Sequence, residues 1–127
     1  MRLFISNYSE AYICFRKAAE AGNIIAQNWV GILLETGKGV RESKVQAANW
    51  YRRAALQGNA DAQYHLGRLY ENGEGVPRDE KKALDLYRSS ADQGSDLARK
   101  ALERLTGKPG AGSESRGRGG LFKGLLG

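Results

Sequence analysis

The sequence predicts an all-α fold, a right-handed α/α solenoid of about six helices arranged in antiparallel pairs. The first observation is internal repetition, because residues 60–95 align with residues 24–59 at a period of 36 residues. The second is that apolar residues recur within each unit at spacings of three and four, the period of an amphipathic helix. The third is that short glycine-rich turns separate the helical stretches, which places neighbouring helices antiparallel. Such units bury one face on their neighbours and form a short superhelix.

The repeat is carried by glycine, alanine and aromatic residues that return one unit later. Glycine suits the turns because it adopts positive φ at low cost. The recurring positions are Gly22, Gly58 and Gly94; Ala26, Ala62 and Ala98; Phe15, Tyr51 and Tyr87; and Gly37, Gly39 and Val40 with Gly73, Gly75 and Val76.

Charge divides the chain into a body and a tail. The 127 residues have a net charge of +6. Residues 1–105, the predicted solenoid, begin in the middle of a repeat and contain 16 Lys and Arg against 13 Asp and Glu. Residues 106–127 contain four basic residues and one acidic residue, and their glycine-rich composition predicts a flexible basic tail. The body is only mildly basic, which argues against a broad nucleic-acid surface on the repeats.

Few residues are available for disulfide, metal or membrane chemistry. Cys14 is the only cysteine, and we expect a buried core thiol because its repeat position holds Trp50 and Leu86. His65 is the only histidine, so we expect a surface residue and predict no metal site and no cofactor. No apolar run approaches the roughly 20 residues of a membrane-spanning helix, and the start is too short for a signal peptide, so we expect a cytoplasmic protein.

Cap residues mark the helix boundaries. Asn7 followed by Glu10 forms a capping box, which predicts the first helix over about 8–21. Residues 1–4 align with the turn at 37–40, so the chain is expected to begin inside a turn. The later helices are predicted over 24–36 after Asn23, from Ser43 to Gly58, from Asn59 to the turn at Gly73, from Asp79 to Gly94, and over 96–105 after Ser95.

Each helix has one predicted inward face. Gly31 and Gly67 lie inside helices, where glycine costs about 0.5–1 kcal/mol relative to alanine, and we attribute them to close helix approach with Ala47 and Ala83 opposite. The predicted inward residues are Ala11, Phe15, Ala18 and Ala19; Ala26, Val30, Leu33 and Leu34; Ala47, Trp50, Tyr51, Ala54 and Ala55; Ala62, Leu66, Leu69 and Tyr70; Ala83, Leu86, Tyr87 and Ala91; and Ala98, Leu102 and Leu105.

Two linked motifs carry a family resemblance. Residues 62–76 read Ala-x-x-x-Leu-Gly-x-x-Tyr-x-x-Gly-x-Gly-Val, and residues 47–59 read Ala-x-x-x-Tyr-x-x-Ala-Ala-x-x-Gly-Asn. The pattern resembles the Sel-one-like repeat (SLR), a branch of the tetratricopeptide-like α/α solenoids, over about residues 8–105. The upstream copy departs from the pattern with Val30 in place of leucine and Leu34 in place of tyrosine. The last copy departs from it with Ser90 in place of alanine and Ser95 in place of asparagine. The resemblance implies a protein-binding adaptor and no catalytic residues.

The resemblance also implies that the first helix of each pair lines a concave groove. Its residues would change from apolar Ile25, Trp29 and Ile32 to basic Lys100 and Arg104, which suits an extended or helical peptide with apolar anchors and an acidic end. The alternative is a solvated face whose apolar residues pack on the preceding helix. The predicted partner-binding residues are Ile25, Asn28, Trp29, Ile32, Glu35, Asp61, Tyr64, His65, Arg68, Glu71, Lys100 and Arg104.

A second series of basic residues recurs on the other helices of the pairs. Arg16, Arg52 and Arg88 stand one period apart and could form a basic ridge when stacked. The simpler interpretation, which we favour, is that they are charged solvent positions beside acidic residues such as Glu20 and Asp92.

Both ends of the chain carry apolar residues with no predicted partner. Tyr12 and Phe15 on the first helix, with residues 3–5 before it, are expected to be uncovered. This edge would then pair with a second copy or a partner, or the chain would be a fragment of a longer repeat array. In the tail, residues 116–120 resemble a fragment of an RNA-binding RGG segment. Residues 121–126 place their apolar side chains on one helical face, which fits a partner, an anionic membrane, the groove of another copy, or a frayed terminus.

Three functions are compatible with these features. We expect a non-enzymatic adaptor or scaffold whose groove binds a protein or peptide. The alternative is a nucleic-acid or membrane-surface accessory that acts through the basic tail. A hydrolase is the third, because some secreted, cysteine-rich members of the repeat family are linked to β-lactam binding or hydrolysis. Their paired cysteines are absent here, and no Ser/His/Asp or carboxylate constellation replaces them.

Overall fold

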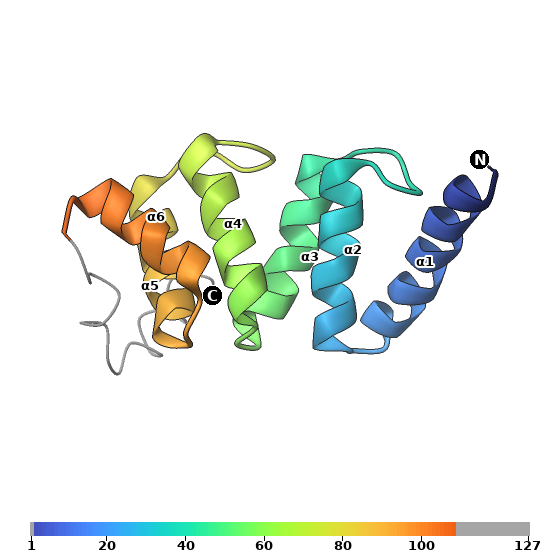
Figure 1. Ribbon diagram of the computed structural model, residues 1–127, viewed down its shortest axis with the longest axis horizontal. Helices are drawn as coiled ribbons and strands as arrows, with labels where there is room; N and C mark the ends of the chain where they lie inside the picture. The colour runs from blue at the N-terminus through green and yellow to red at the C-terminus, as the bar shows by residue number, and fades with distance from the viewer. Residues whose placement is uncertain (1, 109–127) are drawn as a thin grey trace.

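The computed structural model describes the backbone of residues 2–108 and the side chains of residues 7–108. Within this range the chain forms six α-helices and no strand (Figure 1), as the all-α prediction requires. The predicted tail begins at residue 106, and its residues 109–127, with the segments 116–120 and 121–126, lie outside the described residues, as do the side chains of residues 3–5. The helices are α1 (Arg2–Glu20), α2 (Ile24–Thr36), α3 (Lys44–Leu56), α4 (Ala60–Asn72), α5 (Glu80–Asp92) and α6 (Asp96–Thr106).

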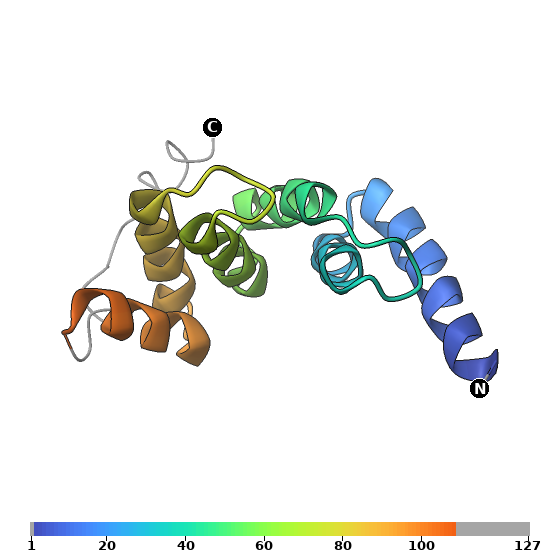
Figure 2. The same cartoon turned by 90° about the horizontal axis from the view of Figure 1, so that it is seen from above.

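The helices are stacked in chain order. The main packing contacts each join two helices that are consecutive in the sequence. Figure 2 shows the result as an open arch, with α1 at one end and α6 at the other, and with α2 and α4 on its inner side. A solenoid of antiparallel helix pairs is therefore confirmed. Among the described residues no helix is both long and apolar enough to cross a membrane.

The predicted N-caps of α2 to α6 are confirmed. The side chain of Asn23 accepts a 2.8 Å hydrogen bond from the Ala26 N–H, and Asn59 makes the same bond one unit later. Such a bond satisfies one of the N–H groups that a helix start leaves without an intrahelical partner. At the other end, Gly37 has φ +72° and its N–H donates to the Leu33 carbonyl, a left-handed cap that stops α2. The remaining N-caps are Ser43, Asp79 and Ser95.

The start of α1 differs from the prediction. The helix begins at Arg2, so Asn7 lies inside it and is not an N-cap, and residues 2–4 are helical where a turn was predicted. The reason is local. The corresponding turn of the next unit has Gly37 and Gly39 at φ +72° and +74°, whereas residues 1 and 3 of the first copy are Met and Leu. Without glycine the positive φ angles are unfavourable, and the helix extends instead.

The two helix-interior glycines are contact points, as predicted, but the partner is a tyrosine ring. A Cβ atom built on Gly31 would lie 2.5 Å from the Tyr51 ring, and one on Gly67 would lie 2.9 Å from the Tyr87 ring. The predicted partner Ala83 contributes only a backbone oxygen at 3.4 Å from that Cβ position. Glycine is therefore the residue that lets the tyrosine of one helix pack directly on the backbone of the helix before it.

The core follows the predicted inward faces. All of those residues on α2, α3 and α4 are buried, and one continuous cluster runs from α1 to α6. The helices at the ends are less completely covered, because each has fewer neighbours within the described residues. The predicted inward residues that are only partly buried are Ala11, Phe15 and Ala18 on α1, Ala91 on α5 and Leu105 on α6.

Cys14 is exposed, so the prediction of a buried thiol is wrong. Trp50, one unit later, is buried partly because α1 stands before its helix. The guanidinium of Arg16 lies 5.8 Å from the centre of the Trp50 ring, and that of Arg53 lies 4.5 Å from it. In the described part of the chain no helix stands before α1 in this way, which leaves the Cys14 position open.

Candidate functional site

The candidate site is the inner face of the arch, which α2, α4 and α6 supply with side chains from each unit. Its first component is the carboxylate of Glu35 near the end of α2, which is 8% exposed. The Tyr51 hydroxyl donates to it at 2.7 Å, and the Arg68 guanidinium forms a two-pronged contact with both oxygens at 2.7 and 2.8 Å. Lys44 adds a longer ion pair of 3.8 Å. One carboxylate thus joins α2 to α3 within a unit and to α4 of the next unit.

The same arrangement recurs one period later. The Tyr87 hydroxyl donates to Glu71 at 2.7 Å, and Arg104 on α6 binds the two oxygens of that carboxylate at 2.7 and 3.0 Å. We call Glu35, Tyr51 and Arg68, together with Glu71, Tyr87 and Arg104, the acid ladder. Because bidentate Arg–carboxylate pairs fix geometry as well as charge, the ladder holds successive units in one orientation.

Hydrogen bonds keep both ladder carboxylates ionised. Burial raises the pKa of Glu35, but the bonds from Arg68 and Tyr51 lower it by more, so the pKa lies below its usual value. For Glu71 the hydrogen bond from Arg104 is the largest cause of the lowered pKa. Burial, and then the bond to a charged carboxylate, raises the pKa of each tyrosine. Four of the predicted partner-binding residues are therefore already paired within the chain, Glu35 with Arg68 and Glu71 with Arg104.

His65 is part of the same layer and is not the plain surface residue that we expected. Its ring stacks on Tyr51, with centroids 4.9 Å apart and planes 21° apart, and it is only partly exposed. Burial, and then the charge of Arg68, lowers the pKa of His65 below its usual value. Tyr64 lies beside it, and the centre of the Tyr64 ring is 5.8 Å from the centre of the Tyr87 ring. Both predicted residues are therefore supports of the inner face with limited free surface.

The apolar part of the inner face is on α2. Ile25 is 65% exposed and Trp29 is 43% exposed, while Ile32 is partly buried. The Trp29 ring stacks on Phe15 of α1, with centroids 5.8 Å apart and planes 14° apart. Trp29 thus packs on the preceding helix and also keeps much of its surface free. We call Ile25, Trp29 and Ile32 the Trp29 patch.

The other predicted groove residues differ in accessibility. Asp61 and Lys100 are exposed. Asn28 is buried, and its Oδ1 accepts no hydrogen bond from any described residue. The exposed charges of opposite sign, together with the paired charges of the acid ladder, leave the inner face close to neutral. Apolar contact is therefore its most distinctive chemistry.

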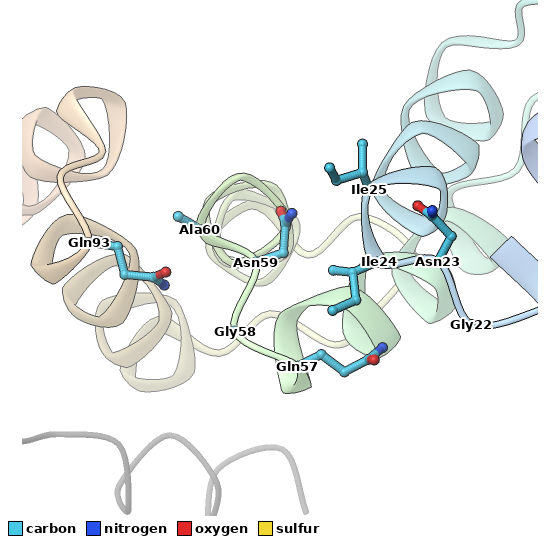
Figure 3. A pocket seen from close by; sticks show the side chains of 9 residues that line it. All are labelled: Gly22, Asn23, Ile24, Ile25, Gln57, Gly58, Asn59, Ala60 and Gln93. Carbon is cyan, nitrogen blue, oxygen red and sulfur yellow. The ribbon is translucent and has the colours of Figure 1, made fainter. Parts of the chain in front are cut away.

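An open hollow of about 540 Å³ adjoins the Trp29 patch. Figure 3 shows that the turns before α2 and before α4 line it, with Ile24 and Ile25 on one side and Asn59 and Ala60 on the other. Ile25 is the residue shared with the predicted groove. Sequence reasoning missed the rest of this lining because turn residues were assigned only to capping.

A ladder of glutamines was also missed. The Gln27 amide donates to the Ala19 carbonyl at 3.1 Å, and Gln57 donates to Gln27 at 2.9 Å. One unit later Gln63 donates to the Ala55 carbonyl at 3.3 Å, and Gln93 donates to Gln63 at 2.9 Å. The repetition of glutamine at these positions was the available signal. The bonds to Ala19 and Ala55 join each unit to the helix before it, and the bonds between glutamines join the two helices within a unit.

The three recurring arginines are already engaged. Arg16 binds Glu20 at 2.9 Å, Arg52 donates to the Tyr70 hydroxyl at 2.9 Å, and Arg88 lies 3.6 Å from Asp85. These contacts match the simpler interpretation of ordinary charged positions. Metal binding is a separate question. Among the described residues, no group of three or more His, Cys, Asp or Glu side chains is placed to hold a metal ion.

The uncovered surface predicted on α1 is seen only in part. Ile13 is 54% exposed and Tyr8 is 42% exposed. Tyr12 and Phe15 are partly buried, because Tyr12 accepts a hydrogen bond from Arg16 and Phe15 stacks on Trp29. Pairing with a second copy through this helix stays a prediction.

Comparison with known proteins agrees with this geometry. The Sel1 repeat model matches residues 5–23, 24–59 and 60–95. These segments coincide with the units predicted from the sequence, the first of them being incomplete. Among curated proteins no sequence matches this chain.

Two solved structures are similar to the chain. One is a protective antigen present in uropathogenic Escherichia coli strains, displaying an SLR fold, with 35% identity and a TM-score of 0.76 over 77% of this chain and 21% of that chain. The other is a Sel1 repeat protein from Oxalobacter formigenes, with 39% identity and a TM-score of 0.65 over 66% of this chain and 34% of that chain. The chain therefore spans about a fifth and a third of the lengths of these relatives.

Proposed function

Because the chain belongs to the Sel1 repeat family, whose members are typically protein–protein interaction scaffolds, we propose that it is a non-enzymatic scaffold that binds a protein or peptide along the inner face of the arch. The observation that carries this proposal is the Trp29 patch. A tryptophan held flat against Phe15, yet 43% exposed, is a rigid apolar anchor. Tryptophan is also enriched among the residues that dominate binding energies.

The acid ladder supports the proposal by making the inner face rigid. Each carboxylate is bound by a tyrosine and an arginine from two other helices. A surface that is ordered before binding loses less conformational entropy when a partner arrives. Because the ladder charges are internally paired, the affinity of a partner is expected to come from apolar side chains, and Asp61 and Lys100 orient it.

The preferred partner is an extended or helical peptide with apolar anchors. Ile25, Trp29 and Ile32 lie four and three residues apart on α2, which is the spacing of one helix face. A helical partner with leucine or phenylalanine at the same spacing can place its side chains against them. Burial of each such apolar side chain contributes about 1.5–3 kcal/mol before the costs of association.

The test uses synthetic amphipathic peptides with leucine or phenylalanine four residues apart, titrated against the full chain. Trp29→Ala is expected to weaken binding about thirtyfold, because truncating a central tryptophan commonly removes about 2 kcal/mol or more. The matched control is Leu56→Ala on α3, since Leu56 is 41% exposed and does not belong to the inner face. Circular dichroism confirms that both variants keep the fold. Equal affinities for the two variants would refute the proposed site.

The other functional hypotheses stay predictions. The nucleic-acid or membrane alternative concerns the tail, which from residue 109 onward lies outside the described residues. Our proposal of a non-enzymatic role is supported by the ladder, since its buried titratable groups hold the units together in pairs. A hydrolase screen in which one substitution abolishes turnover would refute it.

A further inference from the structure

The Trp29 patch is an anchor surface with a defined shape. Ile25 to Ile32 spans about 10 Å along the helix axis at 1.5 Å per residue. At one end the patch continues through Ile25 into the hollow between the turns before α2 and α4 (Figure 3). A ligand that fits it must therefore offer a short apolar stripe of about one to two helical turns, with one side chain large enough to enter the hollow.

The chain contains one such stripe outside the described residues. Residues 121–126 read Leu-Phe-Lys-Gly-Leu-Leu. On a helix, the four apolar residues of this segment would share one face over about 7.5 Å, while Lys123 would point elsewhere. Phe122 is the side chain suited to the hollow beside Ile25. We call residues 121–126 the C-terminal segment.

The connection is long enough for the C-terminal segment to reach the patch in the same molecule. Thirteen residues lead from Lys108, just after α6, to Leu121. Fully extended, they span about 43–47 Å. The path from α6 back to α2 crosses four helix interfaces of about 8–10 Å each, which amounts to about 32–40 Å across the helix axes, so the connection must be almost fully extended.

Charge favours this occupant over a strongly acidic one. Asp61 is exposed and holds on α4 the repeat position that Ile25 holds on α2. It is therefore available to Lys123, the charged residue of the C-terminal segment. The carboxylates of Glu35 and Glu71 are already occupied by Arg68 and Arg104, so they neither attract nor repel the segment strongly.

From these observations we infer that residues 121–126 dock on the Trp29 patch of the same molecule and cover it until a partner displaces them. The docking stands on the patch, the segment and the connection between them. Its regulatory consequence, competition with a partner, rests on the function proposed above. The r.m.s. length of a 13-residue glycine-rich tether is about 20 Å, roughly half of this path, so its effective concentration lies below the millimolar value of a matched linker. A segment whose dissociation constant equals that effective concentration would halve the free groove, and its loss would raise partner affinity about twofold.

The experiment uses the full chain and the indole N–H signals of its two tryptophans in ¹⁵N-labelled protein. Trp29→Phe assigns the signals. The double substitution Leu125→Ser and Leu126→Ser is expected to shift the Trp29 signal and to increase acrylamide quenching of Trp29. The signal of Trp50, which is buried beside Arg53, is expected to stay in place. Adding a peptide of residues 119–127 to the variant should restore the original Trp29 signal. Glu114→Gln, in the same tail, is the control and should change nothing.

Three results would overturn the inference. The first is a Trp29 signal that does not move in the double variant. The second is a shift that grows with protein concentration, which would mean that the segment docks on another copy. The third is a shift of both tryptophan signals together, which would mean a change in the fold and not the release of a docked segment.

The outcome is separable from that of the proposed function. If Leu125 and Leu126 control the Trp29 signal but no peptide binds in a Trp29-dependent manner, the docking stands and the scaffold proposal fails. If peptides bind through Trp29 and the double variant leaves both the signal and the affinity unchanged, the scaffold proposal stands and the docking fails.

Discussion

The hydroxyl of Tyr51 donates a 2.7 Å hydrogen bond to the carboxylate of Glu35, which lies 16 residues earlier on the neighbouring helix. The Tyr51 ring also packs against Gly31, one helical turn before Glu35. The Tyr51 ring thus fits against the backbone of Gly31, which has no side chain, and its hydroxyl is bound to the buried Glu35 carboxylate. Tyr87 repeats both contacts with Gly67 and Glu71. This pair of contacts defines how the two helices of a unit fit together.

Replacing Glu35 by alanine is expected to lower the free energy of unfolding by about 2–3 kcal/mol. The change leaves the Tyr51 hydroxyl without its acceptor and the Arg68 guanidinium without its carboxylate. Because the Arg68 side chain is 29% exposed, the cost is placed below that of a fully buried pair. Urea unfolding, followed by circular dichroism, measures it.

Glu71→Ala is the matched control, because the chemistry is the same and the site is more open. The Arg104 side chain is 58% exposed, so it returns to water when its partner is lost. The expected cost is about 1 kcal/mol. If Glu71→Ala lowered the free energy of unfolding as much as Glu35→Ala, burial would not explain the larger effect expected at Glu35.

Gly31→Ala is expected to destabilise the protein by about 1–3 kcal/mol, although alanine is the better helix former. The added Cβ would lie 2.5 Å from a ring that its own hydroxyl bond holds in place. Gly67→Ala should cost less, since the corresponding distance is 2.9 Å. Thermal unfolding of the two variants gives the ranking. A stabilising effect of either change would show that the tyrosine can move away freely.

Gln63→Leu is expected to cost about 1–3 kcal/mol even though leucine has a similar size. Gln63 is 1% exposed, donates to the Ala55 carbonyl and accepts from Gln93. Leucine would leave that buried carbonyl without its side-chain donor. Replacing the exposed Gln93 by leucine is the control and should cost less, because the Gln63–Ala55 bond remains. Equal unfolding free energies for Gln63→Leu and the parent chain would contradict this role.

Stability is expected to fall as the pH drops below 6.5, because the pKa of His65 is lowered in the folded state. Below pH 6.5 His65 binds a proton more readily in the unfolded chain than in the folded chain, so protonation stabilises the unfolded state and lowers the free energy of unfolding. His65→Phe keeps a ring to stack on Tyr51 and should remove this part of the pH dependence. Thermal midpoints of both proteins, measured from pH 7 down to the range where carboxylates protonate, provide the check. A slope that persists in the variant would assign it to another group.

A second loss of stability is expected at lower pH, from the ladder carboxylates. The folded pKa values of Glu35 and Glu71 lie below the usual 4.5, so their contribution is complete above that pH. It disappears as the pH falls from 4.5 through the folded pKa values. In the double variant Glu35→Gln and Glu71→Gln, the thermal midpoint should change less over this range. The same pH dependence in parent and variant would rule out the ladder as its origin.

Most of the helices could be predicted from the sequence because their boundaries are local. A cap such as Asn23 bonds an N–H only three residues away, and a stop such as Gly37 depends on its own φ angle. The first helix was mispredicted for an equally local reason. Asn7 and Glu10 have the right spacing for a cap, but no glycine stands before them to break the helix.

The candidate site was predicted as a face and not as a set of contacts. The period places Ile25, Trp29 and Ile32 together on α2, and the structure confirms that Ile25 and Trp29 are exposed. The sequence could not show that Arg68 is already bound to Glu35, because these residues are 33 positions apart and lie in different units. The sequence also could not show that Cys14 is exposed while Trp50, at the same repeat position, is packed against Arg16 of α1.

The sequence by itself determined the repeat, the α-helical class, the positions of the turns after α1 and most of the residues that face inward. These properties follow from the backbone angles of glycine, from caps that act over one turn, and from the period of apolar residues. Only the tertiary structure decided which charges are paired, which glycine meets which ring and which apolar side chains stay exposed. The reason is physical: these contacts depend on the rotation from one unit to the next, and that angle is set by side chains that meet only after the units have stacked.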